Sequence, residues 1–83
     1  PLTRVIAGLS FVGSEVTRPV ISEASRMFNI DVNILLGQVD EVQGKGFGTL
    51  TILTSCNTDT FSQLLEYLRK HNVTVEEVTS HVL

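Results

Sequence analysis

Cysteine, tryptophan and clustered basic residues are scarce in this chain of 83 residues, and each scarcity excludes a class of function. The single cysteine, Cys56, rules out an intrachain disulfide and a CxxC metal or redox pair. The six Lys and Arg are scattered and outnumbered by nine Asp and Glu, which leaves a net charge of −3. Four Phe and one Tyr provide no stacking platform, so we expect no nucleic acid partner.

Long apolar runs are also missing, as are the residue clusters that carry catalysis or metal binding. No stretch of about 20 apolar residues is present, so we expect no direct insertion into a membrane. His71 and His81 have no cysteine or carboxylate cluster around them, and the serines lack an evident general base. For this chain itself we predict no catalytic residue, no metal site and no cofactor.

The sequence does have the composition of one small folded domain. Apolar residues make up 42% and charged residues 18% of the chain, which is typical of a globular domain. We interpret residues 1–83 as a single domain, and the abrupt start at Pro1 suggests a domain cut from a longer protein.

Hydrophobic periodicity predicts elements in the order β-α-β-β-α-β. Strands are predicted at residues 5–12, 31–42, 47–55 and 73–78, with a glycine turn at 43–46. Helices are predicted at residues 18–28 and from the capping residues 57–60 to the basic residues 69–71. This order is that of an α+β ferredoxin-like fold, a four-stranded antiparallel sheet with two helices on one face. The apolar stripes of the helices are expected at Val20, Ala24, Met27 and Phe28, and at Phe61, Leu64, Leu65 and Leu68.

The stretch DVNILLGQV at residues 31–39 has apolar side chains on both faces of its predicted strand. Because two helices cover only one face of the sheet, a second apolar face or edge is expected to meet a partner. The simplest partner is a second copy, so we predict a homodimer through the sheet; the alternative is a monomer with an exposed apolar face. Strict alternation places Val32, Ile34 and Leu36 on one face, and Asn33, Leu35, Gly37 and Val39 on the other.

Residues 42–48, VQGKGFG, resemble the phosphate-binding loop of acylphosphatases, which share this order of elements. That chemistry needs a guanidinium to hold the phosphoryl oxygens, and Gly48 occupies the arginine position. The segment also joins two predicted strands, whereas the enzyme loop leads from the first strand into a helix. A hairpin turn is the better interpretation, and a phosphatase-like activity is disfavoured.

Several short motifs, taken in order along the chain, resemble the NIL domain family, which is named after the motif present here as Asn33-Ile34-Leu35. The resemblance covers about residues 4–80. It implies the ferredoxin-like fold, dimerisation and binding of methionine near the dimer interface. The other motifs are Gly13, Val16 and Pro19; Ser22, Glu23, Ser25, Arg26, Phe28 and Asn29; Gln38; and Gly44, Phe47 and Gly48.

NIL domains form the C-terminal regulatory part of the ATPase subunit of bacterial methionine-import ABC transporters. The resemblance therefore implies a non-catalytic domain that binds L-methionine and inhibits import by a parent that uses ATP and magnesium. It also implies a membrane permease subunit as the parent's partner, at the cytoplasmic face of the bacterial cell membrane. The alternative is a NIL-type dimerisation module with another ligand or none, attached to a ferredoxin-like or other protein.

Carried over residue by residue, the resemblance implies a ligand site at the start of the first helix together with Asn33. The free N–H groups of a helix start suit a carboxylate, and valine and isoleucine side chains suit an unbranched thioether. The Asn33 amide offers donors and an acceptor to an amino acid, and Gln38 is a candidate supporting residue. The implied ligand residues are Val16, Thr17, Arg18, Pro19, Val20, Ile21 and Asn33.

Overall fold

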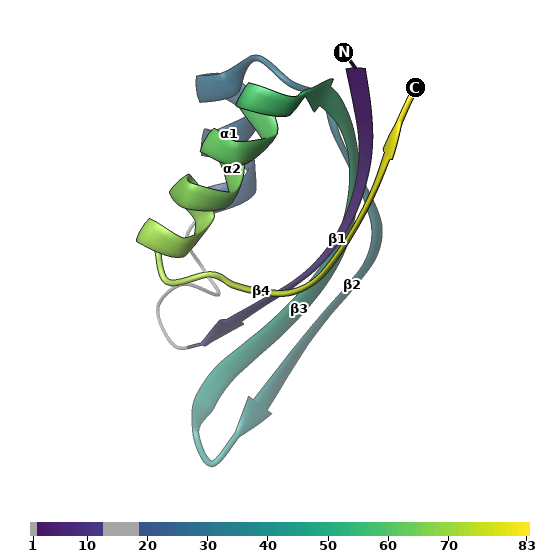
Figure 1. The fold of residues 1–83 in the computed structure, drawn as a ribbon. Helices are drawn as coiled ribbons and strands as arrows, with labels where there is room; N and C mark the ends of the chain where they lie inside the picture. Colours follow the sequence, from purple (N-terminus) through teal and green to yellow (C-terminus); the bar gives the residue numbers. More distant parts are fainter. Residues whose placement is uncertain (1, 13–18) are drawn as a thin grey trace.

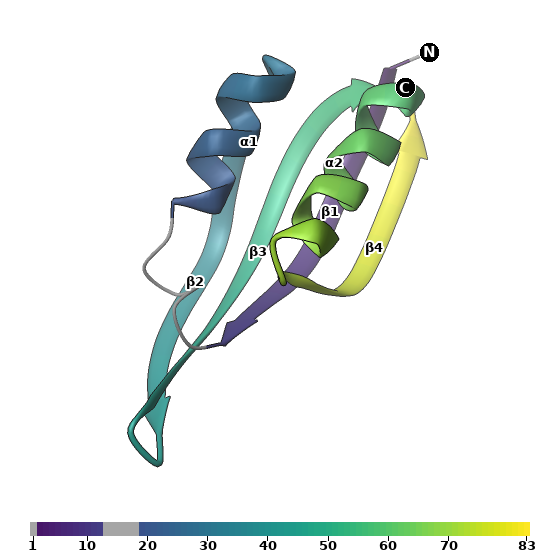
Figure 2. The same ribbon diagram turned by 90° about the vertical axis from the view of Figure 1, so that its left-hand side faces the viewer.

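The predicted α+β ferredoxin-like fold is confirmed by a computed structural model, which describes residues 2–12 and 19–83. The strands form one antiparallel sheet in the order β2-β3-β1-β4, and both helices lie on the same face of it (Figures 1 and 2). The elements are β1 (Leu2–Val12), α1 (Val20–Phe28), β2 (Val32–Val42), β3 (Lys45–Asn57), α2 (Thr58–Lys70) and β4 (Thr74–Val82).

Local capping and turn chemistry set the element boundaries. α2 begins after Asn57, whose Oδ1 accepts a hydrogen bond of 2.8 Å from the Thr60 N–H. α1 ends at Asn29, which has a left-handed φ of 52°. The β2–β3 hairpin turns at Gln43 and Gly44, both with positive φ, and this conformation matches the twist of paired strands.

Three of the four strands, β1, β3 and β4, run further than the sequence predicted. β4 was expected to end at residue 78 but continues to Val82, because it pairs with β1 as far as Thr3. β3 likewise extends at both ends, because it pairs with β1 from Phe47 to Asn57 and with β2 as far as Lys45. Pairing with a neighbouring strand therefore extends segments whose own residues give only a weak strand signal.

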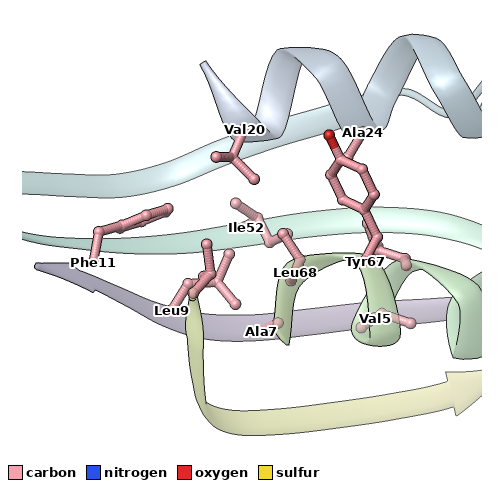
Figure 3. Packing of buried hydrophobic residues seen from close by; sticks show 11 residues of the cluster. Val5, Ala7, Leu9, Phe11, Val20, Ala24, Ile52, Tyr67 and Leu68 are labelled. Carbon is pink, nitrogen blue, oxygen red and sulfur yellow. The ribbon is translucent and has the colours of Figure 1, made fainter. Parts of the chain in front are cut away.

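The core lies between the two helices and the face of the sheet that they cover (Figure 3). Alternate residues of β1 point into it, as the period of a strand requires. Val20 and Ala24 of α1 lie one turn apart and face the same cluster, while Leu68 of α2 is completely buried. The buried apolar residues are Val5, Ala7, Leu9, Phe11, Val20, Ala24, Ile52, Leu64, Tyr67, Leu68 and Val73.

Tyr67 joins the two helices, although the sequence did not place it in the core. Its ring meets Phe28 edge to face, with 5.7 Å between the ring centroids, and its hydroxyl donates to Glu23 Oε2 over 3.2 Å. Met27 was predicted in the apolar stripe of α1 but is 62% exposed, since it lies at the margin of that stripe. The remaining predicted stripe residues are buried or partly buried.

A β-bulge in β2 makes the predicted strict alternation of its side chains wrong. The pairing with β3 shifts its register between Ile34 and Leu36, so the residues after the bulge change faces. Directly paired residues of antiparallel strands share a face, which fixes the assignment. Leu36 lies with Asn33 on the open face, and Gly37 and Val39 lie on the face that the helices cover.

The β2–β3 hairpin projects beyond the ends of both helices (Figures 1 and 2). The helix layer therefore stops part-way along the sheet. Where the helix layer stops, the start of α1 lies over the middle of β2 and β3 (Figure 2). This arrangement positions the candidate site.

Candidate functional site

A pocket of about 310 Å³ lies where the start of α1 meets the β2–β3 hairpin and the end of β1. Its volume is at the lower end of the range typical of small-molecule sites. Three elements of the sheet and one helix contribute to it, so no short segment of sequence contains it. The lining residues are Phe11; Pro19, Val20, Ile21 and Ser22; Gly37, Gln38 and Val39; and Gly48, Thr49 and Leu50.

Two glycines leave the floor of the pocket open. By their pairing, Gly37 and Gly48 lie on the helix-covered face of neighbouring strands, where a larger residue would project toward α1. Neither has a positive φ, so neither is required by its backbone conformation. A glycine inside a strand often marks a place where a ligand or another backbone approaches closely.

The start of α1 has N–H donors for which the described residues provide no acceptor. The first intrahelical bond runs from the Glu23 N–H to the Pro19 carbonyl over 3.0 Å. The N–H groups of Val20, Ile21 and Ser22 therefore have no acceptor within the helix, and no side chain of Pro19 caps them. These groups and the positive end of the helix dipole favour an anion such as a carboxylate.

The walls of the pocket are apolar. Phe11, Val39 and Leu50 line it from three strands, and Val20 and Ile21 line it from α1. Figure 3 shows Phe11 and Val20 at the same end of the buried cluster, which the pocket adjoins. None of its described lining residues carries a charge, so a charged group of a ligand would be met by main-chain dipoles and by the Ser22 hydroxyl.

The structure brings four of the predicted site residues together around this pocket: Pro19, Val20, Ile21 and Gln38. The predicted residues Val16, Thr17 and Arg18 lie outside the described residues.

The two amides of the DVNILLGQV stretch are placed differently from one another. The Gln38 side chain donates to Asp40 Oδ2 over 2.8 Å, and its pairing with Thr49 puts it on the open face. Gln38 therefore contributes to the pocket through its main chain. Asn33 is exposed and does not line the pocket.

Asn33 borders a second, more open depression of about 610 Å³ between the end of α1 and the start of α2. On its floor the Thr54 hydroxyl donates to the Asp31 carbonyl over 2.7 Å. Cys56 also lines it, and burial raises the pKa of this thiol above its ordinary value, which disfavours the reactive thiolate form.

Sequence reasoning missed the other seven lining residues, which are Phe11, Ser22, Gly37, Val39, Gly48, Thr49 and Leu50. The available signal was a glycine inside each of two predicted strands, Gly37 and Gly48. A glycine weakens a strand, so its presence there often indicates that a ligand or another backbone approaches closely. Gly48 itself was interpreted as a missing arginine and as part of a family hairpin motif, and not as a pocket residue. Among the residues that the structure describes, no group of three His, Cys, Asp or Glu could hold a metal, and no helix could cross a membrane.

Comparison with known proteins relates this chain to one family. Residues 5–77 match the family model of the NIL domain. The chain belongs to the NIL domain family. This confirms the resemblance carried by the sequence motifs.

Relatives of this NIL domain include methionine import ATP-binding proteins. It is 45% identical over 71 residues to methionine import ATP-binding protein MetN 1 of Paraburkholderia xenovorans, covering 86% of this chain and 21% of that relative. Identity to methionine import ATP-binding protein MetN of Burkholderia thailandensis is 44%, with the same coverage. The NIL domain thus spans about a fifth of the length of the curated relatives that it matches.

A solved structure shares the fold. It is the C-terminal domain of an ABC transporter ATP-binding protein from Enterococcus faecalis, with a TM-score of 0.68 and 24% identity. The match covers 86% of this chain and 79% of that one, so most of the ferredoxin-like arrangement is common to both.

Proposed function

We propose that this NIL domain is a non-catalytic regulatory domain of a methionine-import ABC transporter ATPase, and that bound L-methionine inhibits ATP-driven import. The 45% identity to a methionine import ATP-binding protein over 86% of the chain carries the proposal. ATP and magnesium would then be bound by the parent ATPase, which would act with a membrane permease subunit at the cytoplasmic face of the bacterial cell membrane.

The pocket at the start of α1 is the proposed methionine site. The ligand carboxylate would accept hydrogen bonds from the N–H groups of Val20 to Ser22, where the helix dipole favours a negative charge. The thioether chain would lie against Phe11, Val39 and Leu50, which offer dispersion contacts and no polar group. The predicted residues Val16, Thr17 and Arg18 immediately precede this helix start in the sequence.

Asn33 needs a separate place in the proposal, because it does not line this pocket in its own chain. A ligand held at a homodimer interface could receive the Asn33 amide from the second copy. The amide is exposed and lies on the open face, so a second chain can reach it.

We also propose that the domain dimerises through its sheet. Leu36, Phe47 and Val12 are exposed on the open face to 66%, 38% and 57%. The adjoining edge strand β2 adds Ile34 and Leu35, which are exposed to 54% and 49%. A long apolar edge strand beside an apolar face marks a site of association in a small domain.

Dimerisation would connect binding to control of the ATPase. A ligand shifts an equilibrium between two arrangements only by its difference in affinity for them. If one arrangement alone binds methionine, a ligand concentration about 100 times its dissociation constant would favour that arrangement by about 2.7 kcal/mol. This is enough to hold two ATPase subunits in a resting state while cytoplasmic methionine is abundant.

The test of binding is a titration of the ¹⁵N-labelled domain with L-methionine, with L-alanine and D-methionine as control ligands. We expect saturable shifts at residues 19–22 and 37–39 with L-methionine alone. Val39→Asp places a carboxylate at the exposed rim of the pocket and should abolish the shifts. Met27→Asp adds the same charge at a similarly exposed position of α1, away from the pocket, and should leave them unchanged.

Asn33→Ala and Leu36→Lys test the dimer, with Met27→Lys as the matched control. Light scattering should give a dimer for the control and a monomer for Leu36→Lys. Loss of methionine binding in Asn33→Ala would support a ligand shared between two copies. A dimer that shows no shift with millimolar L-methionine would favour the alternative, a NIL-type dimerisation module with another ligand or none.

A further inference from the structure

We infer that Gly48 is a specificity-determining residue, which keeps the floor of the pocket open for a long, unbranched apolar side chain. The inference rests on the proposed function and deepens it, because it says which part of the amino acid the pocket measures. It assigns a role to a glycine that neither the turn nor the packing of the sheet requires.

The space around Gly48 shows that an alanine would fit the fold. A Cβ added there would meet the Gln38 carbonyl oxygen at 3.6 Å, Phe11 Cδ2 at 3.8 Å and Val39 Cγ2 at 3.9 Å. All three are ordinary van der Waals distances, and φ is not positive. A glycine in the interior of a strand makes the fold less stable than an alanine would. Gly48 therefore lowers the stability of the domain and gives the fold nothing in return.

Three other glycines of the sheet and its hairpin turn differ from Gly48 in this respect. Gly44 has a φ of +79° at the hairpin turn, where a side chain would be strained. A Cβ at Gly37 would lie 3.0 Å from Leu50 Cδ2, so packing restricts that position. Gly8 accepts a Cβ at 3.9 Å from the nearest atoms of Glu77, but it lies on the open face and away from the pocket. Gly48 is the described strand glycine that combines free space with a place in the pocket.

The surroundings of that space define the ligand group that fits. Two of the three atoms that the added Cβ would meet belong to Phe11 and Val39, so a hydrocarbon or thioether chain gains contact there. A charged or amide side chain would lose its hydration against these apolar walls without a partner. The donors at the start of α1 belong to the helix layer, and Gly48 belongs to the sheet beneath it (Figure 1), so a carboxylate held at these donors would leave the side chain to extend toward Gly48.

The test compares Gly48→Ala with Gly8→Ala, which adds the same methyl group to the same sheet on its other face. Calorimetric titration would measure the binding of L-methionine, of L-norleucine, which has the same chain length, and of L-norvaline, which is one atom shorter. For Gly48→Ala we expect L-methionine and L-norleucine affinities to fall by about tenfold or more relative to L-norvaline. Gly8→Ala should keep the affinity ratios of the wild type.

Val39→Leu is a second variant, which enlarges the exposed side chain that lies beside Gly48 and leaves the glycine itself in place. It should lower the affinity for all three ligands while keeping more of the preference for L-methionine than Gly48→Ala does. Thermal unfolding of each variant checks that the domain is folded; if Gly48→Ala does not fold, the alanine does not fit the floor and the inference is overturned.

The possible failures are distinguishable. If the wild type binds L-methionine but Gly48→Ala keeps the wild-type ratios, the inference is wrong and the proposed function stands. If the wild type binds L-norleucine and rejects L-methionine, and Gly48→Ala changes the preference for chain length, the inference stands and the methionine proposal fails. If the wild type binds none of the three ligands, both are overturned.

Discussion

Replacing two buried threonines by valine should change the stability of this domain in opposite directions. Thr3 and Thr54 lie on the helix-covered face of neighbouring strands and are 5% and 2% exposed. The Thr54 hydroxyl donates to the Asp31 carbonyl over 2.7 Å. The Thr3 hydroxyl has no hydrogen-bond partner within the described part of the chain. The two sites therefore differ mainly in whether the buried hydroxyl is paired.

The magnitudes follow from the cost of burying a polar group. An unpaired buried hydroxyl costs about 1–3 kcal/mol, so Thr3→Val, which has nearly the same shape, should stabilise the fold by an amount in that range. Thr54→Val removes a hydrogen bond worth about 0.5–1.5 kcal/mol. Asp31 is exposed, so water can rehydrate its carbonyl and the loss should stay near about 1 kcal/mol.

Urea unfolding followed by circular dichroism would measure both changes, at one protein concentration because a dimer gains stability with concentration. About 1 kcal/mol corresponds to a shift of roughly 4–8 °C in the melting temperature of a domain of this size. Thr79→Val, at an exposed position of β4, measures the gain in strand propensity alone. The reasoning is refuted if Thr3→Val and Thr54→Val, each corrected for this control, shift stability in the same direction.

Three further predictions concern the cap, the turn and the cysteine. Asn57→Ala should lower the free energy of unfolding by about 1 kcal/mol, because it removes the acceptor for the Thr60 N–H. Asn57→Asp keeps an acceptor oxygen and should retain most of the wild-type stability, and thermal unfolding would measure both changes. Gly44→Ala should lower the free energy of unfolding by about 1–2 kcal/mol, because an alanine is strained at this positive φ. No atom lies within 4 Å of the added Cβ, so a steric clash would not contribute, and unchanged stability would contradict the positive φ. Burial raises the pKa of the Cys56 thiol, so alkylation at pH 8 should be slower in the folded domain than in urea. The folded state retains this proton to higher pH, so the stability contributed by the protonated thiol should be present below its ordinary pKa and lost as the pH rises through the raised value.

Local sequence signals were sufficient for the order of the elements. Asn29 and Asn57 end and begin the helices where predicted, and the glycine turn at residues 43–46 lies between β2 and β3. These signals act within a few residues, since a cap or a turn depends on the conformation of its own segment. The motifs of the NIL family span most of the chain, and the family match confirms them.

The faces of β2 could not be obtained from the sequence. A strand without a bulge keeps strict alternation, and the bulge between Ile34 and Leu36 is set by pairing with β3. The bulge turns Gly37 and Val39 toward the helix side, where they border the pocket, and it leaves Asn33 and Leu36 on the open face. The predicted grouping of Asn33 with the start of α1 depended on the family resemblance, and the structure of one chain does not bring them together.

The sequence by itself determined the ferredoxin-like order of strands and helices, the family, and the helix start at which Pro19, Val20 and Ile21 lie. Each of these depends on the period, capping and motifs of a continuous segment. The tertiary structure alone decided that Phe11, Gly37 and Gly48 meet that helix start around one pocket. These residues come from three strands, and a cavity between layers exists only after strand register and helix placement are fixed together.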